Sequence, residues 1–167
     1  MAYSIGSDGL LDFSGCADDD EKESQCWSYY QENLSDVAVF AFDGKLVRGF
    51  TRGTFAHIIS GSSNRFDPAI GHDIGFSEKR ARCLPLIKKV LSGEIETQVW
   101  RTLQVKGKKR QLRRVLTVIE AEHKYFVVVL DEIGGRYNLR TAYPTSEEYY
   151  KRCIYGKGTS CGHGGKK

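Results

Sequence analysis

The change in apolar periodicity near residue 95 most constrains the fold of this 167-residue chain. Upstream, a helix is predicted to begin at Ser77 and to stop at Gly93. Its apolar residues recur at helical spacing: Cys83, Leu84, Ile87, Val90 and Leu91. Downstream the period becomes two, which predicts strands at 99–103, 111–120, 125–130 and 137–142. Because helices precede a run of strands, we expect an α+β fold in which N-terminal helices pack on a four-stranded antiparallel β-meander.

Two shorter elements are predicted before that helix. An apolar run from Val37 to Phe42, the turn Asp43-Gly44 and a second run to Phe50 together indicate a hairpin. A short helix is expected around residues 55–59, capped by Thr51 or Thr54. Residues 65–76 contain Pro and Gly breakers and are expected to form a loop.

Charge is divided unevenly along the chain. Residues 1–43 hold ten acidic residues and one basic residue, a net charge of −9, whereas residues 44–167 hold 24 basic and 11 acidic residues, a net charge of +13. We interpret 1–36 as an acidic, partly disordered leader or capping segment, 37–155 as a single domain and 156–167 as a flexible tail. The basic block suits a polyanion such as RNA or DNA, and the acidic segment could lie across it.

Several classes of protein are disfavoured by the sequence. No apolar run approaches the ~20 residues that span a bilayer, and the start of the chain lacks the features of a secretory signal, so we expect a cytoplasmic protein without membrane attachment. The loop motifs of P-loop nucleotide-binding proteins, zinc metalloproteases and serine hydrolases are missing. No cofactor is expected.

The cysteines favour free thiols over a disulfide framework, because they are five in number and lack CxxC spacing. A zinc site built from Cys153, Cys161 and His163 is an open alternative, although this spacing matches no standard zinc pattern. The acidic residues of the basic half do not cluster as a two-metal nuclease requires. The sequence therefore predicts no metal ion.

Candidate catalytic residues are those that metal-free RNA cleavage requires: a base, an acid and a cation for the phosphate. Imidazole suits the proton transfers. His57 lies in the predicted short helix, where a structural role is the alternative, and His72 lies in the loop Gly71-His72-Asp73, where Asp73 could orient an imidazole. Arg140, Thr141 and Tyr143 end the last strand. Regular alternation predicts that Arg140 and Thr141 point to opposite faces and that Thr141 and Tyr143 share one.

Candidate substrate-binding residues form a basic hairpin between the first two long strands. A dense basic set is suited to phosphate contacts, with a solvated hairpin as the alternative. The set comprises Lys106, Lys108, Lys109, Arg110, Arg113 and Arg114.

The order of His57-Ile58-Ile59, the helix from Ser77, the strands and Leu139-Arg140-Thr141-Ala142-Tyr143-Pro144 resembles the barnase/EndoU/colicin/RelE-like ribonuclease fold, over roughly residues 50–145. The resemblance implies a metal-independent endoribonuclease that yields a 2′,3′-cyclic phosphate and a 5′-hydroxyl, as in toxins and phage-associated effectors. It implies that His57 is the general base or acid, that Arg140 and Thr141 contact the phosphate and that Tyr143 supports them. The expected partners are RNA, with tRNA among the candidates, and an acidic immunity or antitoxin protein.

Two other functions stay open on the sequence. One is a non-catalytic module of the same fold that binds nucleic acid or protein. The other is an ADP-ribosyltransferase, which needs a late catalytic glutamate such as Glu147 or Glu148.

Overall fold

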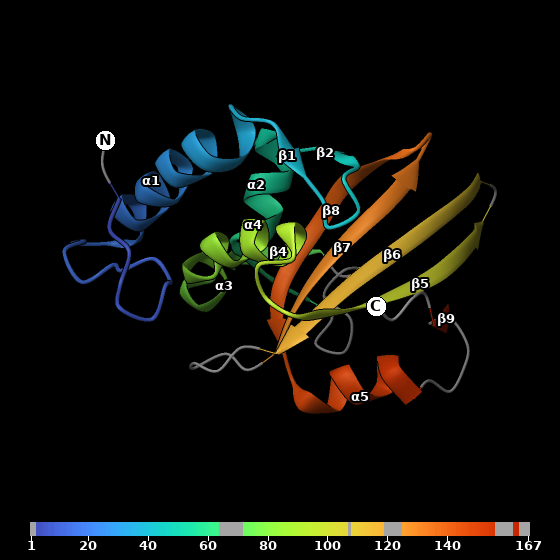
Figure 1. The fold of residues 1–167 in the computed structure, drawn as a ribbon. Coiled ribbons are helices and arrows are strands. Elements are labelled where there is room, and N and C mark those ends of the chain that lie inside the picture. Colours follow the sequence, from blue (N-terminus) through green and yellow to red (C-terminus); the bar gives the residue numbers. More distant parts are fainter. Residues whose placement is uncertain (1–2, 64–71, 107, 119–124, 156–161, 164–167) are drawn as a thin grey trace.

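The structure, a computed structural model, describes residues 3–63, 72–106, 108–118, 125–155 and 162–163. Only the backbone is described for residues 98, 100–106, 108–118, 152–155 and 162–163. Helices gather on one side of a large twisted sheet, and a last helix lies beneath it (Figure 1). The α+β prediction is therefore confirmed.

The N-terminal segment forms an outer layer. Helix α1 (Asp19–Tyr30) begins at Asp18, whose carboxylate accepts a hydrogen bond from the Glu21 backbone N–H, and it continues into a π-helical turn, η1 (Gln31–Ser35). Leu10, Leu11 and Leu34 are buried in the same core as the later helices and strands. The sequence left open a partly disordered leader or a capping segment for 1–36, and the described residues from 3 onward pack on the rest of the chain.

The main sheet has seven described strands and is mixed. In spatial order they are β1 (Val39–Phe40), β2 (Leu46–Arg48), β8 (Arg136–Thr145), β7 (Tyr125–Ile133), β6 (Lys108–Val118), β5 (Thr97–Lys106) and β9 (Gly162–His163). Strands β5 to β8 pair antiparallel in succession, but β2 joins β8 in parallel. The four predicted strands therefore form only the antiparallel part of a larger, mixed sheet, which β1, β2 and β9 also join.

The parallel pairing brings the early hairpin against the last long strand. Val47 pairs with Tyr137, and Gly49 follows directly after β2. Gly49 has a φ of +91°, and a Cβ there would lie 3.0 Å from the backbone N and O of Leu139. Glycine thus permits the close passage of the two backbones. Alternation of apolar residues identifies strands but not their neighbours, so this junction was not predicted.

Between the hairpin and the meander, helices and a small sheet alternate. Helix α2 (Arg52–Ile58) has Thr51 as its N-cap, as expected. Strands β3 (Ser60–Ser62) and β4 (Asp73–Phe76) pair antiparallel, so the loop prediction is wrong for 73–76, and 64–71 lies outside the described residues. The predicted helix from Ser77 is two helices, α3 (Glu78–Arg82) and α4 (Leu84–Ser92), with a proline in the first turn of α4. Gly93, at a φ of +82°, ends α4 as predicted.

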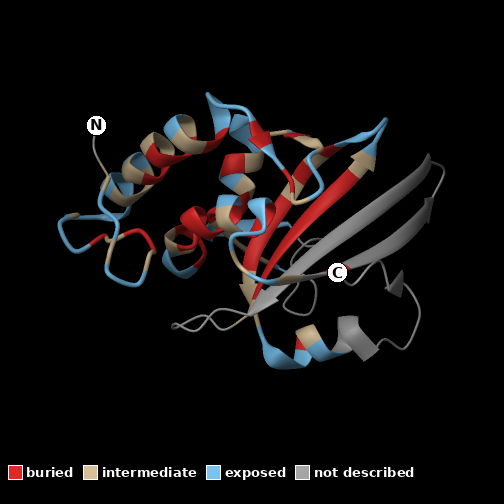
Figure 2. Cartoon of the chain, in the orientation of Figure 1, coloured by how far each residue is buried: buried red, intermediate tan, exposed pale blue. Residues whose placement is uncertain are grey.

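The two faces of the sheet are covered by different elements. Phe126, Val128 and Leu130 of β7 belong to the core formed with α1 to α4. Residues between them point to the opposite face, where helix α5 (Glu147–Tyr155) packs through Tyr149 against Tyr143 and through Tyr150 against Tyr125. Burial is continuous from Phe126 to Asp131 in β7 and from Thr141 to Tyr143 in β8, because both faces are covered there (Figure 2).

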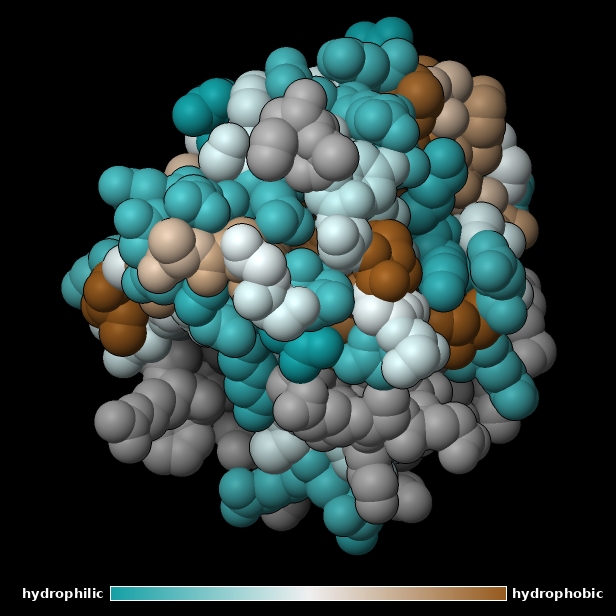
Figure 3. Space-filling model, turned by 90° about the vertical axis from the view of Figure 1, so that its left-hand side faces the viewer, coloured by the Kyte–Doolittle hydropathy of each residue, from teal (hydrophilic) through white to brown (hydrophobic). Residues whose placement is uncertain are grey.

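On the surface, the side of the molecule that carries α1 and α3 is largely hydrophilic over the described residues, with hydrophobic residues in separate small areas (Figure 3). None of the helices in the described ranges combines the length and the apolar character needed to cross a bilayer.

Candidate active site

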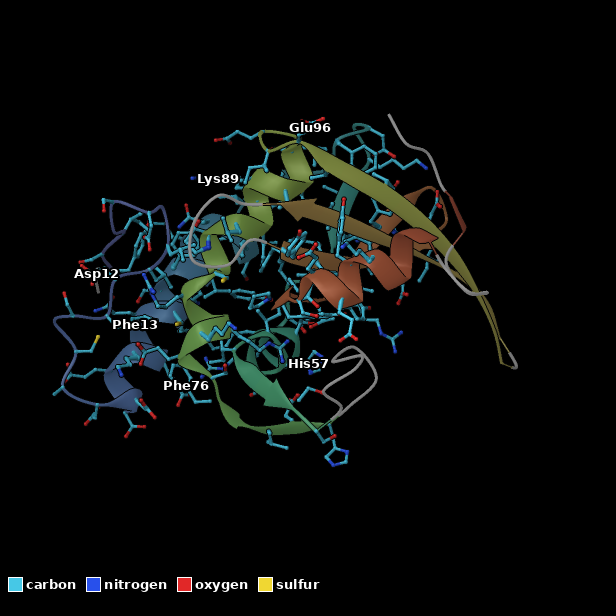
Figure 4. All side chains as sticks on the ribbon, turned by 90° about the horizontal axis from the view of Figure 1, so that it is seen from below. Asp12, Phe13, His57, Phe76, Lys89 and Glu96 are labelled. Carbon is cyan, nitrogen blue, oxygen red and sulfur yellow. The ribbon has the colours of Figure 1, made fainter. Side chains whose placement is uncertain are left out.

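The candidate site begins with a paired histidine and carboxylate. His57, in the last turn of α2, places Nδ1 at 2.6 Å from Oδ1 of Asp73, the first residue of β4. A carboxylate oxygen accepts, so Nδ1 carries the proton of this hydrogen bond and Nε2 is left to exchange one. The His57 side chain is 22% exposed and that of Asp73 is 40% exposed. Figure 4 shows His57 on α2, on the side of the molecule where β3 and β4 lie.

A buried arginine connects this region to the main sheet. Arg80 of α3 is 8% exposed, and its Nη1 donates to the carbonyl of Ser60. Its Nη2 lies 3.4 Å from Oγ1 of Thr141 and 3.3 Å from the carbonyl oxygen of Ala142. Burial is the main influence on this guanidinium and lowers its pKa from the usual value, against the opposing influence of Tyr143 and Asp73.

Arg80 lies beside an edge of the main sheet. Strand β2 pairs with β8 only at Tyr137 and Asn138, so beyond them the outer edge of β8 has no strand neighbour among the described elements. Edge carbonyls need other donors, and Arg80 supplies one to Ala142. The guanidinium also lies over the ring of Tyr143, with Cζ 5.6 Å from the ring centroid.

Thr141 and Tyr143 share a face, as predicted, and both are buried. Thr141 pairs with Val129 and Tyr143 with Val127, on the face that α5 covers. Thr141 is 0% exposed and Tyr143 1% exposed. The Tyr143 hydroxyl lies 3.1 Å from the Tyr149 hydroxyl of α5. In this conformation the two residues hold the end of β8 in place and do not present their hydroxyls to solvent.

Arg140 departs from the predicted alternation because β8 contains a bulge. Leu139 pairs with Leu130 but Thr141 pairs with Val129, which leaves Arg140 as an extra residue. Its Nη1 lies 3.8 Å from Oδ2 of Asp131. Asp131 is two residues from Val129, so Arg140 reaches the same face as Thr141, and the prediction of opposite faces is wrong. The Arg140 side chain is 31% exposed, so this cation near the middle of β8 is partly accessible to solvent.

His72 is not joined to this cluster. Its backbone is held by Ser63, which accepts from the His72 N–H at 3.0 Å and donates to the His72 carbonyl at 2.9 Å. Its side chain is exposed, and the ring makes no hydrogen bond with the residues that the structure describes.

The basic hairpin is placed only by its backbone. Arg114 pairs with Val129, the partner of Thr141, so it lies two strands from Thr141 in the same row. Lys106 and Lys108 pair with each other at the far end of β5 and β6. At ~3.3 Å per residue, this end lies roughly 20 Å along the strand from Arg114. The side chains of the predicted substrate-binding set lie outside the described residues, as does Gly107.

The side chains considered as zinc ligands lie outside the described part of the structure. Cys161 is not described, and only the backbones of Cys153 and His163 are. Within the described ranges no three His, Cys, Asp or Glu side chains come together as metal ligands. Cys16, Cys26 and Cys83 are free thiols.

Two residues of the cluster were not predicted as site residues. Asp73 was noted as able to orient an imidazole, but only the fold makes His57 its partner. The sequence does contain a sign that Arg80 is buried. It stands three residues before Cys83 and four before Leu84, so helical spacing places it on the stripe that faces the core. A charged residue on such a stripe needs buried partners, and the strand edge provides them.

Comparisons with protein-family models, with curated proteins and with solved structures found no match for this chain. The case for a function therefore rests on the geometry of His57, Asp73, Arg80 and the end of β8.

Proposed function

We propose that this protein is a metal-independent endoribonuclease that cleaves RNA by attack of the 2′-hydroxyl on the adjacent phosphate. The hydrogen bond between His57 and Asp73 is the observation that supports the proposal most directly. A carboxylate that accepts from Nδ1 fixes the orientation of the ring and leaves Nε2 to take a proton. The resemblance to the barnase/EndoU/colicin/RelE-like fold supports the same chemistry.

The proposed roles follow from accessibility. His57 takes the 2′-hydroxyl proton or returns a proton to the departing 5′-oxygen, and Asp73 orients it. Arg140 is a partly exposed cation of β8 and is suited to the phosphate oxygens. Arg114, two strands away in the same row, lies where the RNA backbone would continue. The products would be a 2′,3′-cyclic phosphate and a 5′-hydroxyl.

The alternative is a non-catalytic module that binds nucleic acid or protein. One observation favours it: Thr141 and Tyr143, which the resemblance assigns to the phosphate and its support, are both buried, with the Tyr143 hydroxyl against that of Tyr149 in α5. Binding without cleavage would need only the basic strands. An RNA-cleaving toxin of a bacterial cytoplasm, in contrast, would also require an acidic immunity or antitoxin protein to cover the basic half of the chain.

The deciding experiment compares wild type and His57→Ala on total RNA in EDTA, followed by analysis of the RNA ends. We expect discrete fragments with cyclic-phosphate ends from wild type. We expect a loss of about 10²–10⁴-fold in rate for His57→Ala, the usual contribution of general acid–base catalysis.

His72→Ala serves as the second variant because its exposed ring has no contact with the cluster. If His72→Ala no longer cleaves RNA while His57→Ala still does, the catalytic histidine is His72. Intact RNA with wild type, together with salt-dependent retardation of RNA by both proteins, would replace the nuclease with the binding module.

A further inference from the structure

We infer that Arg80 is a positioning residue, which fixes the His57 end of α2 against the edge of β8 and thereby sets the place of the imidazole relative to Thr141 and Arg140. The inference rests on the proposed function for its kinetic consequence. The structural part, that Arg80 fixes α2 against β8, is supported by the hydrogen bonds of Arg80.

The guanidinium bridges two parts of the chain that no strand pairing joins. On one side it donates to Ser60, which begins β3 two residues after the end of α2 and three residues after His57. On the other side it donates to Thr141 and Ala142, which are 61 and 62 residues from Arg80 in sequence. A planar group with its donors in a fixed fork sets the distance and the angle between the two parts together.

The segment that accepts a hydrogen bond from Arg80 is also hydrogen-bonded to the parts of the chain that carry His57 and Asp73. The Ser60 hydroxyl donates to the Ala56 carbonyl at 2.7 Å, next to His57. Ser60 pairs with Phe76, and Ser62 pairs with Asp73, across the β3–β4 sheet. The Ser77 N–H donates to the Ile59 carbonyl at 2.8 Å. A shift of Ser60 would therefore move His57 and Asp73 relative to β8.

The energetics also favour a role beyond ordinary packing. No carboxylate of the described residues lies within ion-pair distance of Arg80, and its Nε–H is buried without an acceptor. Burying a cation in this way is costly, and an apolar side chain of similar volume would often be as stable or more so. Stability alone therefore does not account for an arginine here. The neutral hydroxyl and carbonyl acceptors do not neutralise its charge, but they do fix its geometry.

The test measures cleavage kinetics of Arg80→Ala and Arg80→Lys beside a matched control, Arg136→Ala, which removes an exposed arginine at the β7–β8 turn. The substrate is a labelled RNA oligonucleotide with a site that wild type cleaves in total RNA. At a temperature where every variant is folded, we expect kcat for both Arg80 variants to fall on the order of 10²-fold with little change in KM, because small displacements of a catalytic group are costly. Arg136→Ala should retain the wild-type kcat.

Lysine keeps the charge but lacks the fork, so a wild-type kcat in Arg80→Lys would overturn the inference. If Arg80→Ala does not fold, Thr141→Val removes one acceptor with little change in volume. It should lower kcat about tenfold while Thr141→Ser does not, and equal rates for the two would also overturn it.

A second readout separates this inference from the proposed function. Imidazole ¹H–¹⁵N spectra report the surroundings of each histidine ring whether or not RNA is cleaved. We expect the His57 resonances to shift in the Arg80 variants while those of His72 stay in place. If wild type cleaves no RNA but His57 shifts in this way, the nuclease proposal fails and the positioning role stands. Unchanged His57 resonances in a folded Arg80→Lys variant would overturn the positioning role.

Discussion

The two arginines of α3 lie in regions of different character, although only one residue separates them. Arg82 faces the N-terminal layer, where Nη2 lies 2.9 Å from Oδ2 of Asp8 and Nε donates to the Leu11 carbonyl at 2.9 Å. Arg80 faces the β8 edge, where its acceptors are carbonyls and a hydroxyl. The first arginine is matched by a carboxylate and the second is not.

The difference separates a region that serves stability from one that is suited to chemistry. On the Arg82 side, ion pairs and buried leucines fasten residues 3–36 to the core. On the Arg80 side, a buried cation without a paired carboxylate joins Ser60, near the His57–Asp73 pair, to the end of β8, at some cost in stability. Substitutions in the N-terminal layer should therefore change unfolding, and substitutions near His57 should change the reaction.

Leu11→Ala is the strongest test of the stabilising region. Leu11 is 0% exposed, and truncation of a fully buried leucine costs about 2–5 kcal/mol of unfolding free energy. Urea unfolding followed by circular dichroism measures the loss. Ile5→Ala, at a position 47% exposed, should cost far less, within about 0.5 kcal/mol. Equal losses from the two variants would mean that the N-terminal layer is not anchored through Leu11.

Asp73→Asn tests the Arg80 side. The amide keeps the size of the side chain but can turn a donor toward Nδ1 of His57, so the ring loses its fixed tautomer. We expect the rate of RNA cleavage to fall about 10²-fold or more, while unfolding free energy changes by less than about 1 kcal/mol. Asp36→Asn, at an exposed position after η1, is the matched control. A large loss of stability with an unchanged rate would reverse the comparison.

Asp8→Asn gives the smallest expected effect and depends on pH. The Leu10 N–H and the guanidinium of Arg82 hold the pKa of Asp8 below its usual 3.8, although burial opposes them. A lowered folded-state pKa stabilises the protein above pH 3.8, and this contribution is lost as pH falls through the folded value. We therefore expect Asp8→Asn to lower unfolding free energy by less than about 1 kcal/mol at neutral pH, because the pair is partly exposed.

That small difference between wild type and Asp8→Asn should vanish under acid. Urea titrations of the two proteins at neutral pH and well below pH 3.8 provide the measurement. A difference that persists at low pH would show that the substitution acts through something other than the charge of Asp8.

Local patterns predicted the elements better than their arrangement. The α4 stripe, its stop at Gly93 and the strands of the second half follow from periodicity and glycine chemistry. The parallel pairing of β2 with β8 does not follow from them, because nothing in the sequence indicates that Val47 pairs with Tyr137. The bulge at Arg140 is likewise a property of the pairing with β7, so alternation along one strand could not reveal it.

The candidate site divides in the same way. His57, Thr141 and Tyr143 were singled out by residue type and position, and Thr141 and Tyr143 were correctly assigned to one face. The pairing of His57 with Asp73 required the fold of β3 and β4. Arg80 could be recognised in principle from the helical stripe, whereas the contact of Tyr143 with Tyr149 depends on α5, which follows β8 in the chain.

The long separation between Arg80 and Thr141 has a consequence during synthesis. The ribosome adds residues from the N-terminus, so α2, β4 and α3 emerge well before β8. Until β8 follows, Arg80 has neither Thr141 nor Ala142 to bind, and the His57 end of α2 has no sheet edge to rest against. Any activity that depends on this arrangement would be silent in the nascent chain and would begin only after β8 had been made.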